Sequence, residues 1–347
     1  MSSNHLIIMA GGIGSRFWPV STKECPKQFI DILGNGKTLI QDTVERFKDL
    51  CPINNIWVVT SKNYEKKVKE QIPCIPESNI LLEPCRRNTA PCIAYAAWKI
   101  QLKDPNANMI VTPSDHHIIN VTEFKRVVSS ALEFVQNSNA ILTIGIKPSR
   151  PDTGYGYIEA EHNTNQEIKK VKSFKEKPDL TTAKEYITKD NFFWNSGVFV
   201  WNVSTITTAI STYEPSIAAI FDGIKGFLGS LHEREVINAQ FPNCNNISID
   251  YAVLEKANNV YVYPSDFGWN DLGTWGSLYD FLEHDKDGNV SVASNAVMSE
   301  TNNCIVHAQG NKEIILIGIE DCIIAEHEGK LLICNKAKEQ SIKKLIE

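Results

Sequence analysis

Five short apolar runs, separated by four segments with helical spacing, constrain the fold of the first 146 residues. The runs are HLIIMA, NIWVVT, NILLEP, NMIVTP and AILTIGI. In the first intervening segment, Ile40, Val44 and Phe47 fall on one helical face. Thr38, with Gln41 three residues later, predicts a capping box at the start of that helix. The alternation of strand and helix predicts a mostly parallel sheet with helices on both sides, whose ligands bind beyond the carboxyl ends of the strands.

The pattern changes twice in the rest of the chain. From about Gly145 it is mixed, with strands expected at YGYIEA, IKKVKSFKEKP and NFFWNSGVFVWN and helices expected up to Lys256. From about Asn289, the runs CIVHA, EIILIGI, DCIIAEH and KLLICN predict a small all-β domain, closed by a short helix at EQSIKKLI. A chain of 347 residues suits two domains. We therefore expect an α/β domain over residues 1–288 and a small β domain over residues 289–347.

Composition argues against several classes of protein. The apolar content of 42% and the charged content of 22% are those of an ordinary globular chain. A net charge of -6 argues against a broad nucleic-acid surface but leaves room for a single nucleotide. No apolar run reaches the roughly 18 residues that span a membrane, and the start MSSNHLIIMAGG lacks the features of a signal peptide. Nine cysteines without a Cys-x-x-Cys pair favour reduced thiols, so we expect a cytoplasmic protein.

The stretch AGGIGSRFWPVSTKECPKQF, directly after the first expected strand, is a candidate anion site. Gly11, Gly12 and Gly14 can turn their backbone amides into one concavity that binds an anion. Arg16 and Lys27 would add full charges for oxygens that the amides do not reach. A long loop with these two cations suits a triphosphate better than a single phosphate. A glycine turn with two solvated cations remains the alternative from spacing alone.

Two better-known phosphate motifs do not fit this chain. A dinucleotide-binding loop needs a third glycine where Phe17 stands, and Pro19 would prevent an ordinary helix from starting there. The segment GNGKT at Gly34–Thr38 ends like a P-loop, but Asp31 occupies the place of its first glycine. An acidic side chain there would repel a phosphate, so a turn followed by a capped helix is the better interpretation.

Eight motifs in order along nearly the whole chain carry a family resemblance. They are GGIGSRFWPVSTKECPKQF, EPCRRNTAPCIA, TPSDHHI, PDTGYGYIEA, FKEKPD, WNSGVFVW, SIDYAVLEK and GWNDLGTW. Together they resemble the sugar-nucleotide pyrophosphorylases, a nucleotidyltransferase family, and specifically the mannose-1-phosphate guanylyltransferases. The chain departs from the family pattern at Thr22, where arginine is common, and at Arg86, where glycine is common.

The resemblance implies a Rossmann-like (GT-A-like) α/β nucleotidyltransferase domain with a mixed sheet, followed by a β-helix-like domain, in the short single-activity form. The implied reaction joins mannose 1-phosphate and GTP to give GDP-mannose and pyrophosphate. The sugar phosphate attacks the α-phosphorus in line, so catalysis rests on positioning and electrostatics. Two alternatives stay open: a nucleotidyltransferase for another sugar 1-phosphate or nucleotide, and a non-catalytic homologue that senses nucleotide sugars. A homodimer is also left open.

The resemblance also distributes roles among residues. It implies catalytic roles for Arg16, Lys27 and Asp115. It implies nucleotide binding by Ala10, Gly11, Gly12, Gly14, Ser15, Arg16, Lys27, Arg87, Asn88, Thr89 and Ser114. It implies sugar-phosphate binding by Gly154, Tyr155, Gly156, Glu176, Lys177 and Asn195. Asp115 and Asp271 are the implied ligands of Mg²⁺, a hard cation that prefers oxygen.

Without the resemblance, several of these residues keep plainer interpretations. Asp115 could cap the next segment, Lys177 could be a solvated surface residue, and Asn195 could be a turn residue before Gly197. Asp250 in SIDYAVLEK either contacts substrate or starts a helix. A guanine-reading site would need an acceptor for N1–H and the 2-amino group and a donor for O6, and the sequence alone does not settle which groups provide them.

Overall fold

The computed structural model describes residues 3–12, 15–162, 166–293, 295–308, 310 and 312–346. The described residues fold into two compact units. Unit 1 consists of Met1–Gly11, Val44–Pro113 and Ile118–Trp269, and unit 2 consists of Gly12–Thr43, Ser114–His117 and Asn270–Glu347. The domain boundary expected at residues 288 and 289 stays a prediction, because unit 2 also contains an early segment of the chain.

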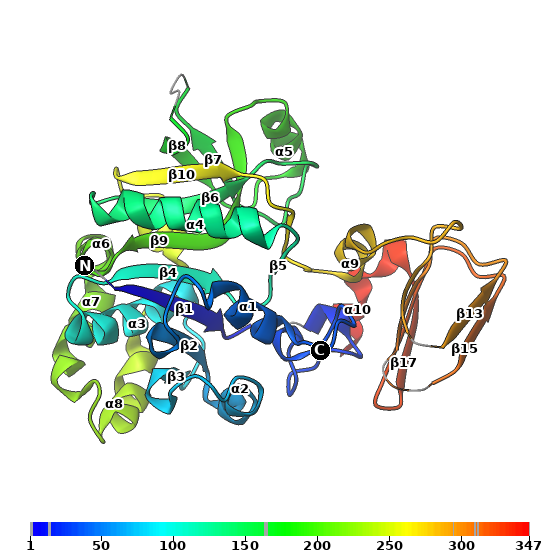
Figure 1. Cartoon of the computed structure of the whole chain (residues 1–347), viewed down its shortest axis with the longest axis horizontal. Coiled ribbons are helices and arrows are strands. Elements are labelled where there is room, and N and C mark those ends of the chain that lie inside the picture. Colours follow the sequence, from blue (N-terminus) through cyan, green and yellow to red (C-terminus); the bar gives the residue numbers. More distant parts are fainter. Residues whose placement is uncertain are drawn as a thin grey trace. The chain divides into compact units, whose positions relative to one another are not determined.

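A mixed β-sheet is the centre of unit 1 (Figure 1). Within the described residues it has nine strands, in the order β3-β2-β1-β4-β9-β6-β10-β8-β7. They are β1 (Asn4–Ala10), β2 (Ile56–Ser61), β3 (Ile80–Glu83), β4 (Asn108–Pro113), β6 (Ile141–Ile146), β7 (Tyr157–Ala160), β8 (Lys169–Lys175), β9 (Phe192–Asn202) and β10 (Val260–Ser265). Each of the eight strands expected in the first 202 residues is present.

The direction of the strands confirms the expected parallel pattern only in part. β1 pairs in parallel with β2 and β4, and β2 does so with β3. The fifth run, β6, does not continue this series next to β4. The long strand β9 lies between them and pairs antiparallel with both. β9 is apolar on both faces and is buried along most of its length, so it takes a central place in the sheet.

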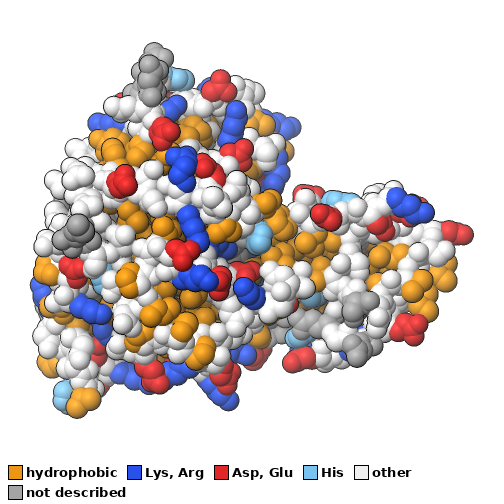
Figure 2. All heavy atoms as spheres, viewed as in Figure 1, with side chains coloured by type: hydrophobic (Ala, Val, Ile, Leu, Met, Phe, Trp, Pro, Cys, Tyr) orange, Lys and Arg blue, Asp and Glu red, His pale blue; other side chains and the backbone are white. Residues whose placement is uncertain are grey.

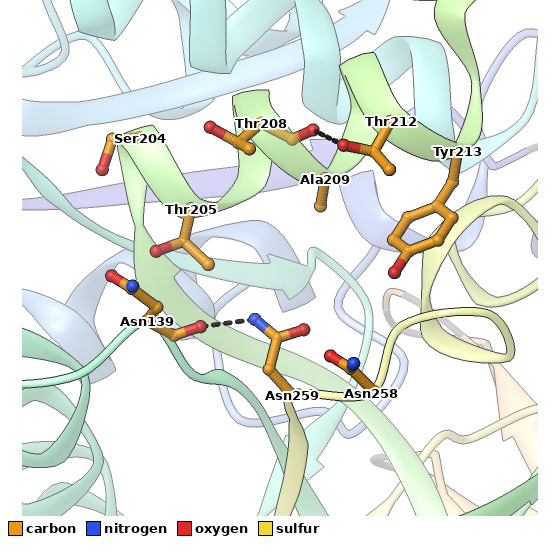
Figure 3. Close-up of a pocket in the computed structure, with 9 residues that line it drawn as sticks. All are labelled: Asn139, Ser204, Thr205, Thr208, Ala209, Thr212, Tyr213, Asn258 and Asn259. Atoms are coloured by element: carbon orange, nitrogen blue, oxygen red, sulfur yellow. Dashed lines mark hydrogen bonds between the residues drawn. The ribbon is translucent and has the colours of Figure 1, made fainter.

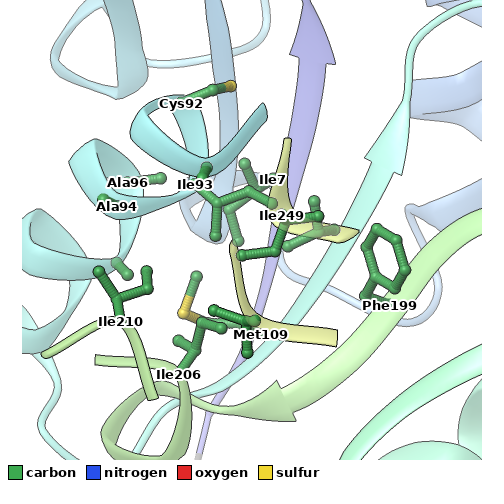
Figure 4. Close-up of a cluster of buried hydrophobic side chains, with 14 of the residues drawn as sticks. Ile7, Cys92, Ile93, Ala94, Ala96, Met109, Phe199, Ile206, Ile210 and Ile249 are labelled. Carbon is green, nitrogen blue, oxygen red and sulfur yellow. The ribbon is translucent and has the colours of Figure 1, made fainter. Parts of the chain in front are cut away.

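Helices cover both faces of this sheet, as the alternation predicts. α3 (Thr89–Lys103), α6 (Val203–Tyr213) and α7 (Pro215–Ile224) pack in one hydrophobic cluster with alternate strand residues such as Ile7 and Met109 (Figure 4). α4 (Val121–Gln136) contacts β4, β6, β9 and β10. The other helices that involve unit 1 are α1 (Leu39–Phe47), α2 (Glu65–Gln71), α5 (Leu180–Ile187) and α8 (Glu233–Gln240).

Local capping explains where several helices begin. The side chain of Gln41 accepts the Thr38 N–H at 2.9 Å, which is the reciprocal bond of the expected capping box. Asn88 caps α3 and Asn120 caps α4, each accepting an N–H of the first turn. Asp250 begins a π-helical turn, Asp250–Leu254, so its expected alternative as a helix start is confirmed.

Unit 2 contains a β-helix-like coil. Successive strands β12 (Val290–Val292), β13 (Ala296–Ser299), β14 (Ile305–Ala308), β15 (Ile314–Ile317) and β16 (Cys322–His327) alternate between two sheets. β12, β13 and β14 each pair in parallel with the strand two places on, and β17 (Lys330–Asn335) closes the larger sheet antiparallel to β16. α9 (Trp275–Phe281) precedes the coil and α10 (Gln340–Ile346) follows it. The expected all-β tail with a closing helix is therefore confirmed.

The segment at residues 12–43 shares a hydrophobic core with this coil. Phe17 and Ile30 lie in one buried cluster with Trp275, Ile305 and Ile323. The ring centroids of Phe17 and Trp275 are 5.1 Å apart in an edge-to-face arrangement. The segment that carries Lys27 is thus anchored by residues from the last third of the chain.

The outer face of the coil carries exposed apolar side chains. Figure 2 shows hydrophobic side chains at the surface over β13 and β15, whose exposed apolar residues are Val297, Ile315 and Ile317; Leu331 and Ile333 of β17, in the other sheet, are also exposed. Val297 lies opposite Ile315 in the register of the two strands. Among the described residues, no helix has the length and apolar character needed to cross a membrane.

Candidate functional site

The glycine loop begins where β1 ends, at the carboxyl edge of the sheet. The Ala10 carbonyl accepts a hydrogen bond from Thr60 Oγ1 at 2.8 Å. The Gly11 carbonyl accepts from Arg86 Nη2 at 2.9 Å. The arginine that departs from the family pattern therefore holds the backbone of the loop. In the next part of the loop, Gln28 Nε2 donates to the Gly12 carbonyl at 3.0 Å.

Of the predicted phosphate-binding residues Gly14 and Ser15, the structure describes only Ser15. Gly14 lies outside the described residues, and Ser15 is the first residue of a short 3-10 turn that ends at Phe17. Arg16, in the same turn, is exposed, and its guanidinium has no hydrogen bond or ion pair with any described residue. An unpaired cation beside a glycine loop is suited to bind an anionic ligand.

Lys27 is the centre of a compact charge cluster. Its side chain is buried, with the residue 7% exposed. The ammonium lies 3.2 Å from Asp115 Oδ2 and donates to the carbonyl oxygens of Asp271 at 2.5 Å and Leu272 at 2.9 Å. Three segments far apart in the sequence therefore meet at one nitrogen. We call Lys27, Asp115 and Asp271 the ammonium cluster.

The ionisation of Asp115 reflects this arrangement. Burial by itself would raise the pKa of its carboxyl group, but the positive charges of Lys27 and His116 outweigh burial and lower it. Asp115 stays charged although its side chain is only 24% exposed. The preceding residue, Ser114, is buried and its carbonyl accepts from Thr43 Oγ1 at 3.3 Å.

The ammonium cluster fits a divalent metal ion in its donor chemistry. The Asp115 carboxylate lies beside the ammonium, and Asp271, whose backbone carbonyl binds the same ammonium, carries a second carboxylate; hard cations prefer such oxygens. The Oδ1 atom of Asp271 accepts the Gly273 N–H at 3.1 Å, which orients that side chain. No three His, Cys, Asp or Glu side chains gather as a metal site anywhere in the described ranges. A metal held here would take its remaining ligands from substrate oxygens and water.

The predicted base-binding loop, residues 86–89, is held by bonds within unit 1. Arg87 donates from Nε (3.0 Å) and Nη2 (2.5 Å) to the Pro242 carbonyl. Thr89 Oγ1 accepts the Ile249 N–H at 2.8 Å. Asn88 has φ of 65°, a left-handed conformation that is costly for this residue type and is concentrated at functional sites. The side chains of Arg87 and Thr89 are thus already engaged, and their nucleotide roles stay predictions.

Glu83 is a site residue that the sequence reasoning missed. It ends β3, is 6% exposed, and its Oε1 has no hydrogen-bond partner among the described residues. Burial raises the pKa of its carboxyl group to about 7, against the opposing effects of a hydrogen bond from Cys92 and the charge of Arg86. Its Oε2 lies 3.4 Å from the point where a Cβ on Gly11 would stand. A buried acceptor therefore lies beside the glycine loop.

The predicted sugar-phosphate residues gather near the end of β6. Glu176 Oε2 lies 2.6 Å from the position of a Cβ on Gly156, so only glycine fits there beside Glu176. Lys177 pairs with Glu176, keeps a side chain that is 63% exposed, and has φ of 45°. Gly154 donates its N–H to Asp152 Oδ1 at 2.8 Å, which forms the turn before Tyr155.

Aromatic rings form the wall beside this turn. The Tyr155 ring packs edge-to-face on Trp194 and Trp269, at 5.1 and 5.2 Å between centroids. Trp194 is buried, with 4% exposed, so its place is in the core, as expected from the sequence. Asn195, the next residue, donates from Nδ2 to Asp250 Oδ1 at 2.9 Å. Like Glu83, Asp250 is a candidate site residue to which the sequence analysis assigned no single role.

A separate pocket of about 350 Å³ lies at the opposite edge of the same sheet. Asn139 and Asn259, which immediately precede β6 and β10, line it together with the α6 hydroxyl groups of Thr205, Thr208 and Thr212 (Figure 3). Its lining is polar and uncharged. The pocket contains none of the predicted site residues, because those follow the carboxyl ends of the strands.

Comparison with known proteins agrees with the fold and the motifs. The Nucleotidyl transferase family model matches residues 5–288, and the MannoseP isomerase/GMP-like beta-helix domain model matches residues 294–347. A mannose-1-phosphate guanylyltransferase of Escherichia coli is 35% identical over an alignment of 350 positions that covers 98% of this chain and 74% of that protein. Alginate biosynthesis protein AlgA of Pseudomonas aeruginosa is 34% identical over 98% of this chain and 71% of its own length.

A solved structure extends the likeness to three dimensions. The crystal structure of mannose-1-phosphate geranyltransferase from Thermus thermophilus has a TM-score of 0.89 to this chain at 27% identity. The match covers 99% of this chain and 98% of that chain. The chain belongs to the nucleotidyl transferase family. Within it, the curated relatives of the whole chain include the mannose-1-phosphate guanylyltransferases, which confirms the resemblance found in the motifs.

The family match also confirms that the protein is an enzyme and a nucleotidyltransferase. The family acts on nucleoside triphosphates and sugar phosphates and generally uses a divalent metal ion. The individual site residues are not tested by these matches.

Proposed function

We propose that the protein transfers GMP from GTP to mannose 1-phosphate, with GDP-mannose and pyrophosphate as products. The relatives named above support the choice of substrates. The observation that carries the proposal is the ammonium cluster, in which Lys27, Asp115 and Asp271 meet. A reaction between two anionic substrates needs such fixed positive charge and metal-binding oxygens.

The reaction needs no nucleophile from the protein. A phosphate oxygen of mannose 1-phosphate forms a bond to the α-phosphorus of GTP, and the bond from that phosphorus to the bridging oxygen of pyrophosphate breaks. Negative charge grows on the leaving group. Arg16, which is exposed and unpaired within the described chain, is proposed to meet the outer phosphates. Lys27 is proposed to act near the α-phosphate while holding Asp115 in its charged form.

Asp115 and Asp271 are proposed to hold the metal ion, and we propose Mg²⁺ because the donors are hard oxygens. When bound, this ion would neutralise phosphate charge during the transfer. The carbonyl of Asp271 binds Lys27, so the backbone that carries its carboxylate is fixed in advance. The protein therefore contributes preorganised ligands rather than a flexible chelating loop.

Glu83 is the proposed acceptor for guanine. A carboxylate accepts two N–H groups side by side, which matches guanine N1–H and the 2-amino group. Its unpaired Oε1 and raised pKa indicate a carboxyl group whose charge is poorly satisfied by the described residues. Donors from guanine would satisfy that charge, whereas the edge of adenine presents an acceptor at N1 and would leave it unsatisfied. This assignment supports GTP over ATP.

The remaining proposed contacts are with the sugar phosphate. Lys177 has an exposed side chain that can leave Glu176 for a phosphate. Glu176 and Asn195 are proposed to bind hexose hydroxyl groups. The cytoplasm is the proposed compartment, since all nine cysteines are free of disulfides.

Pyrophosphate release, measured with a panel of sugar 1-phosphates and nucleoside triphosphates, tests the proposal. We expect the highest kcat/KM with mannose 1-phosphate and GTP in the presence of Mg²⁺. A clear preference for another pair would replace the proposed substrates. Binding of GDP-mannose without any turnover would instead favour the nucleotide-sugar-sensing alternative.

A further inference from the structure

Asp250 has a defined place in the hexose region that the motif around it does not explain. It begins the π-helical turn Asp250–Leu254, and its side chain is partly buried. The residues before it are tied to the start of α3. The Ala90 N–H donates to the Ile247 carbonyl at 3.1 Å, and Thr89 holds the Ile249 N–H. The backbone directly before Asp250 is therefore fixed.

The partners of Asn195 determine which way its amide points. Its Oδ1 accepts from Thr143 Oγ1 at 3.1 Å and from the Gly197 N–H at 3.2 Å. A backbone N–H is always a donor, so the atom that faces Gly197 is the amide oxygen. The amide nitrogen then faces Asp250 Oδ1 at 2.9 Å, and a carboxylate only accepts. The orientation is therefore fixed from both ends.

This fixed orientation limits what Asn195 can offer a ligand. Both hydrogen bonds to its oxygen are already made by the protein. Of the two N–H groups on Nδ2, one is used by Asp250 and one remains. Asn195 can thus only donate to a hexose hydroxyl. Glu176, whose carboxylate is 12% exposed, can only accept when ionised.

The charges around Asp250 fit this arrangement, in which Asn195 donates and Glu176 accepts. Burial and the negative charge of Glu176 raise the pKa of Asp250 to about 6, while its own N–H, the Ser248 hydroxyl and Lys177 act in the opposite direction. Asp250 is thus more costly to ionise than an exposed aspartate, because it lies buried beside a second carboxylate. The N–H of Asn195 is one of the donors that make this charge tolerable.

We propose that Asp250 is a positioning residue that makes Asn195 a pure hydrogen-bond donor, so that the hexose subsite requires one hydroxyl group that accepts and another that donates. The inference rests on the proposed function, because it concerns the sugar of that reaction. Asp250 acts through Asn195, and the specificity for hydroxyl chemistry follows from the direction of that amide.

Three variants test the positioning role. Asp250→Ala is expected to raise KM for mannose 1-phosphate by about 10- to 100-fold, with KM for GTP changed less than about threefold. Asp250→Asn keeps an acceptor oxygen for the Asn195 amide and is expected to restore most of the affinity. Asp190→Ala removes an exposed acid just before β9 and is expected to change neither constant.

Substrate analogues test the direction of the hydrogen bonds. Deoxy and fluoro analogues of mannose 1-phosphate are compared at each hydroxyl, since fluorine accepts weakly and cannot donate. We expect one position, at Asn195, where fluorine is tolerated better than hydrogen, and another, at Glu176, where both are equally poor. In Asp250→Ala, the fluoro analogue should lose its advantage over the deoxy analogue at the hydroxyl that faces Asn195. In Asp250→Asn, that advantage should remain.

The outcomes separate this inference from the proposed function. A wild-type protein without turnover counts against the proposed function. Normal wild-type turnover with an unchanged mannose 1-phosphate KM in Asp250→Ala, or an equal rise in KM for GTP, overturns the positioning role alone. If Asp250→Ala fails to fold, the analogue series on the wild type and Asp250→Asn decides. If deoxy and fluoro analogues lose affinity for the wild type equally at every hydroxyl, the positioning role of Asp250 is overturned.

Discussion

Asp115 and Asp250 are the same residue type in two opposite surroundings. Asp115, in unit 2, lies 3.2 Å from a buried ammonium, and its pKa is lowered despite burial. Asp250, in unit 1, shares its surroundings with Glu176, and burial raises its pKa to about 6. Glu83 resembles Asp250, since burial raises its pKa to about 7.

The difference separates two ways in which a protein prepares a charged site. At the ammonium cluster the protein supplies the compensating charge itself, so the carboxylate is ready before any ligand arrives. At Glu83 and Asp250 part of the compensation is missing within the protein. A ligand with N–H donors would complete it at Glu83, whereas at Asp250 the Asn195 amide supplies one donor; at both residues the buried charge lowers the stability of the fold.

Removal of Lys27 is expected to have the largest effect on this comparison. Lys27→Met leaves Asp115 and two carbonyls without their donor. We expect turnover to fall at least about 100-fold. We also expect a loss of about 2–3 kcal/mol of folding stability, below the cost of about 3–5 kcal/mol for breaking a wholly buried pair. Pyrophosphate release and chemical unfolding measure the two effects.

The pH dependence of the Lys27 effect checks its cause. The pKa of Asp115 is lowered on folding, so the pair stabilises the protein fully at neutral pH, and its contribution is lost as the pH falls below about 4. The stability difference between wild type and Lys27→Met should therefore shrink in acid. Lys37→Ala, an exposed lysine in the same unit, serves as the control. A stability difference that does not change with pH would mean that packing, not charge, is lost.

Arg16 is expected to affect the rate without affecting stability. Its guanidinium is exposed and unpaired within the described ranges, so Arg16→Ala removes no contact of the folded protein. Loss of one charge-assisted contact to the leaving pyrophosphate costs about 2–4 kcal/mol, or roughly 100-fold in kcat. Calorimetric GTP affinity should weaken less than the rate. If affinity and rate fall in proportion, Arg16 is only a binding clamp.

Asp271→Asn is expected to act through the metal ion. The substitution keeps the backbone carbonyl that binds Lys27 and an Oδ1 acceptor for Gly273, but removes one negative charge. We expect the Mg²⁺ concentration for half-maximal activity to rise about tenfold, with an unchanged melting temperature. Magnesium titration of the turnover rate measures this. An unaltered magnesium requirement would remove Asp271 from the metal site.

Glu83→Gln is expected to change stability in the direction opposite to Lys27→Met. The pKa of Glu83 is raised on folding to about 7, so ionisation lowers wild-type stability above pH 7 and this cost disappears as the pH falls toward 4.5. The variant should be about 1–3 kcal/mol more stable than wild type at pH 8 and equal to it near pH 4.5. GTP affinity should fall in the same variant.

A matched control separates burial from general charge in this experiment. Glu313→Gln removes an exposed carboxylate and should leave stability at both pH values unchanged. A Glu83→Gln protein that is no more stable than wild type at pH 8 would show that the Glu83 charge is satisfied in solution. In that case the contrast with Asp115 would not hold.

The sequence predicts the elements of this fold better than their arrangement. Strands such as β1 and helices such as α4 follow from local apolar spacing, which needs no knowledge of distant residues. The insertion of β9 between β4 and β6 does not follow, because it depends on pairing with strands many residues away. Local patterns contain no information about such pairings.

The same distinction applies to the site. Asp115 and Asp271 stand in motifs that the family resemblance identifies, so both could be named from the sequence. Glu83 and Asp250 also stand in two of the motifs, but each is a single acid without a spacing signal; the resemblance assigns no role to Glu83 and leaves that of Asp250 open. Their importance comes from burial and from neighbours such as Arg86 and Asn195, which only the folded chain brings near.

The shared core of unit 2 has a consequence for the order of events during synthesis. Phe17 and Ile30 leave the ribosome early, but their partners Ile305 and Ile323 are translated last. At about 5–20 residues per second, the early segment waits roughly 15–60 s for those partners. Over that time the segment that carries Arg16 and Lys27 has no completed core of its own, so a nascent chain is expected to form its sheet before its proposed phosphate site.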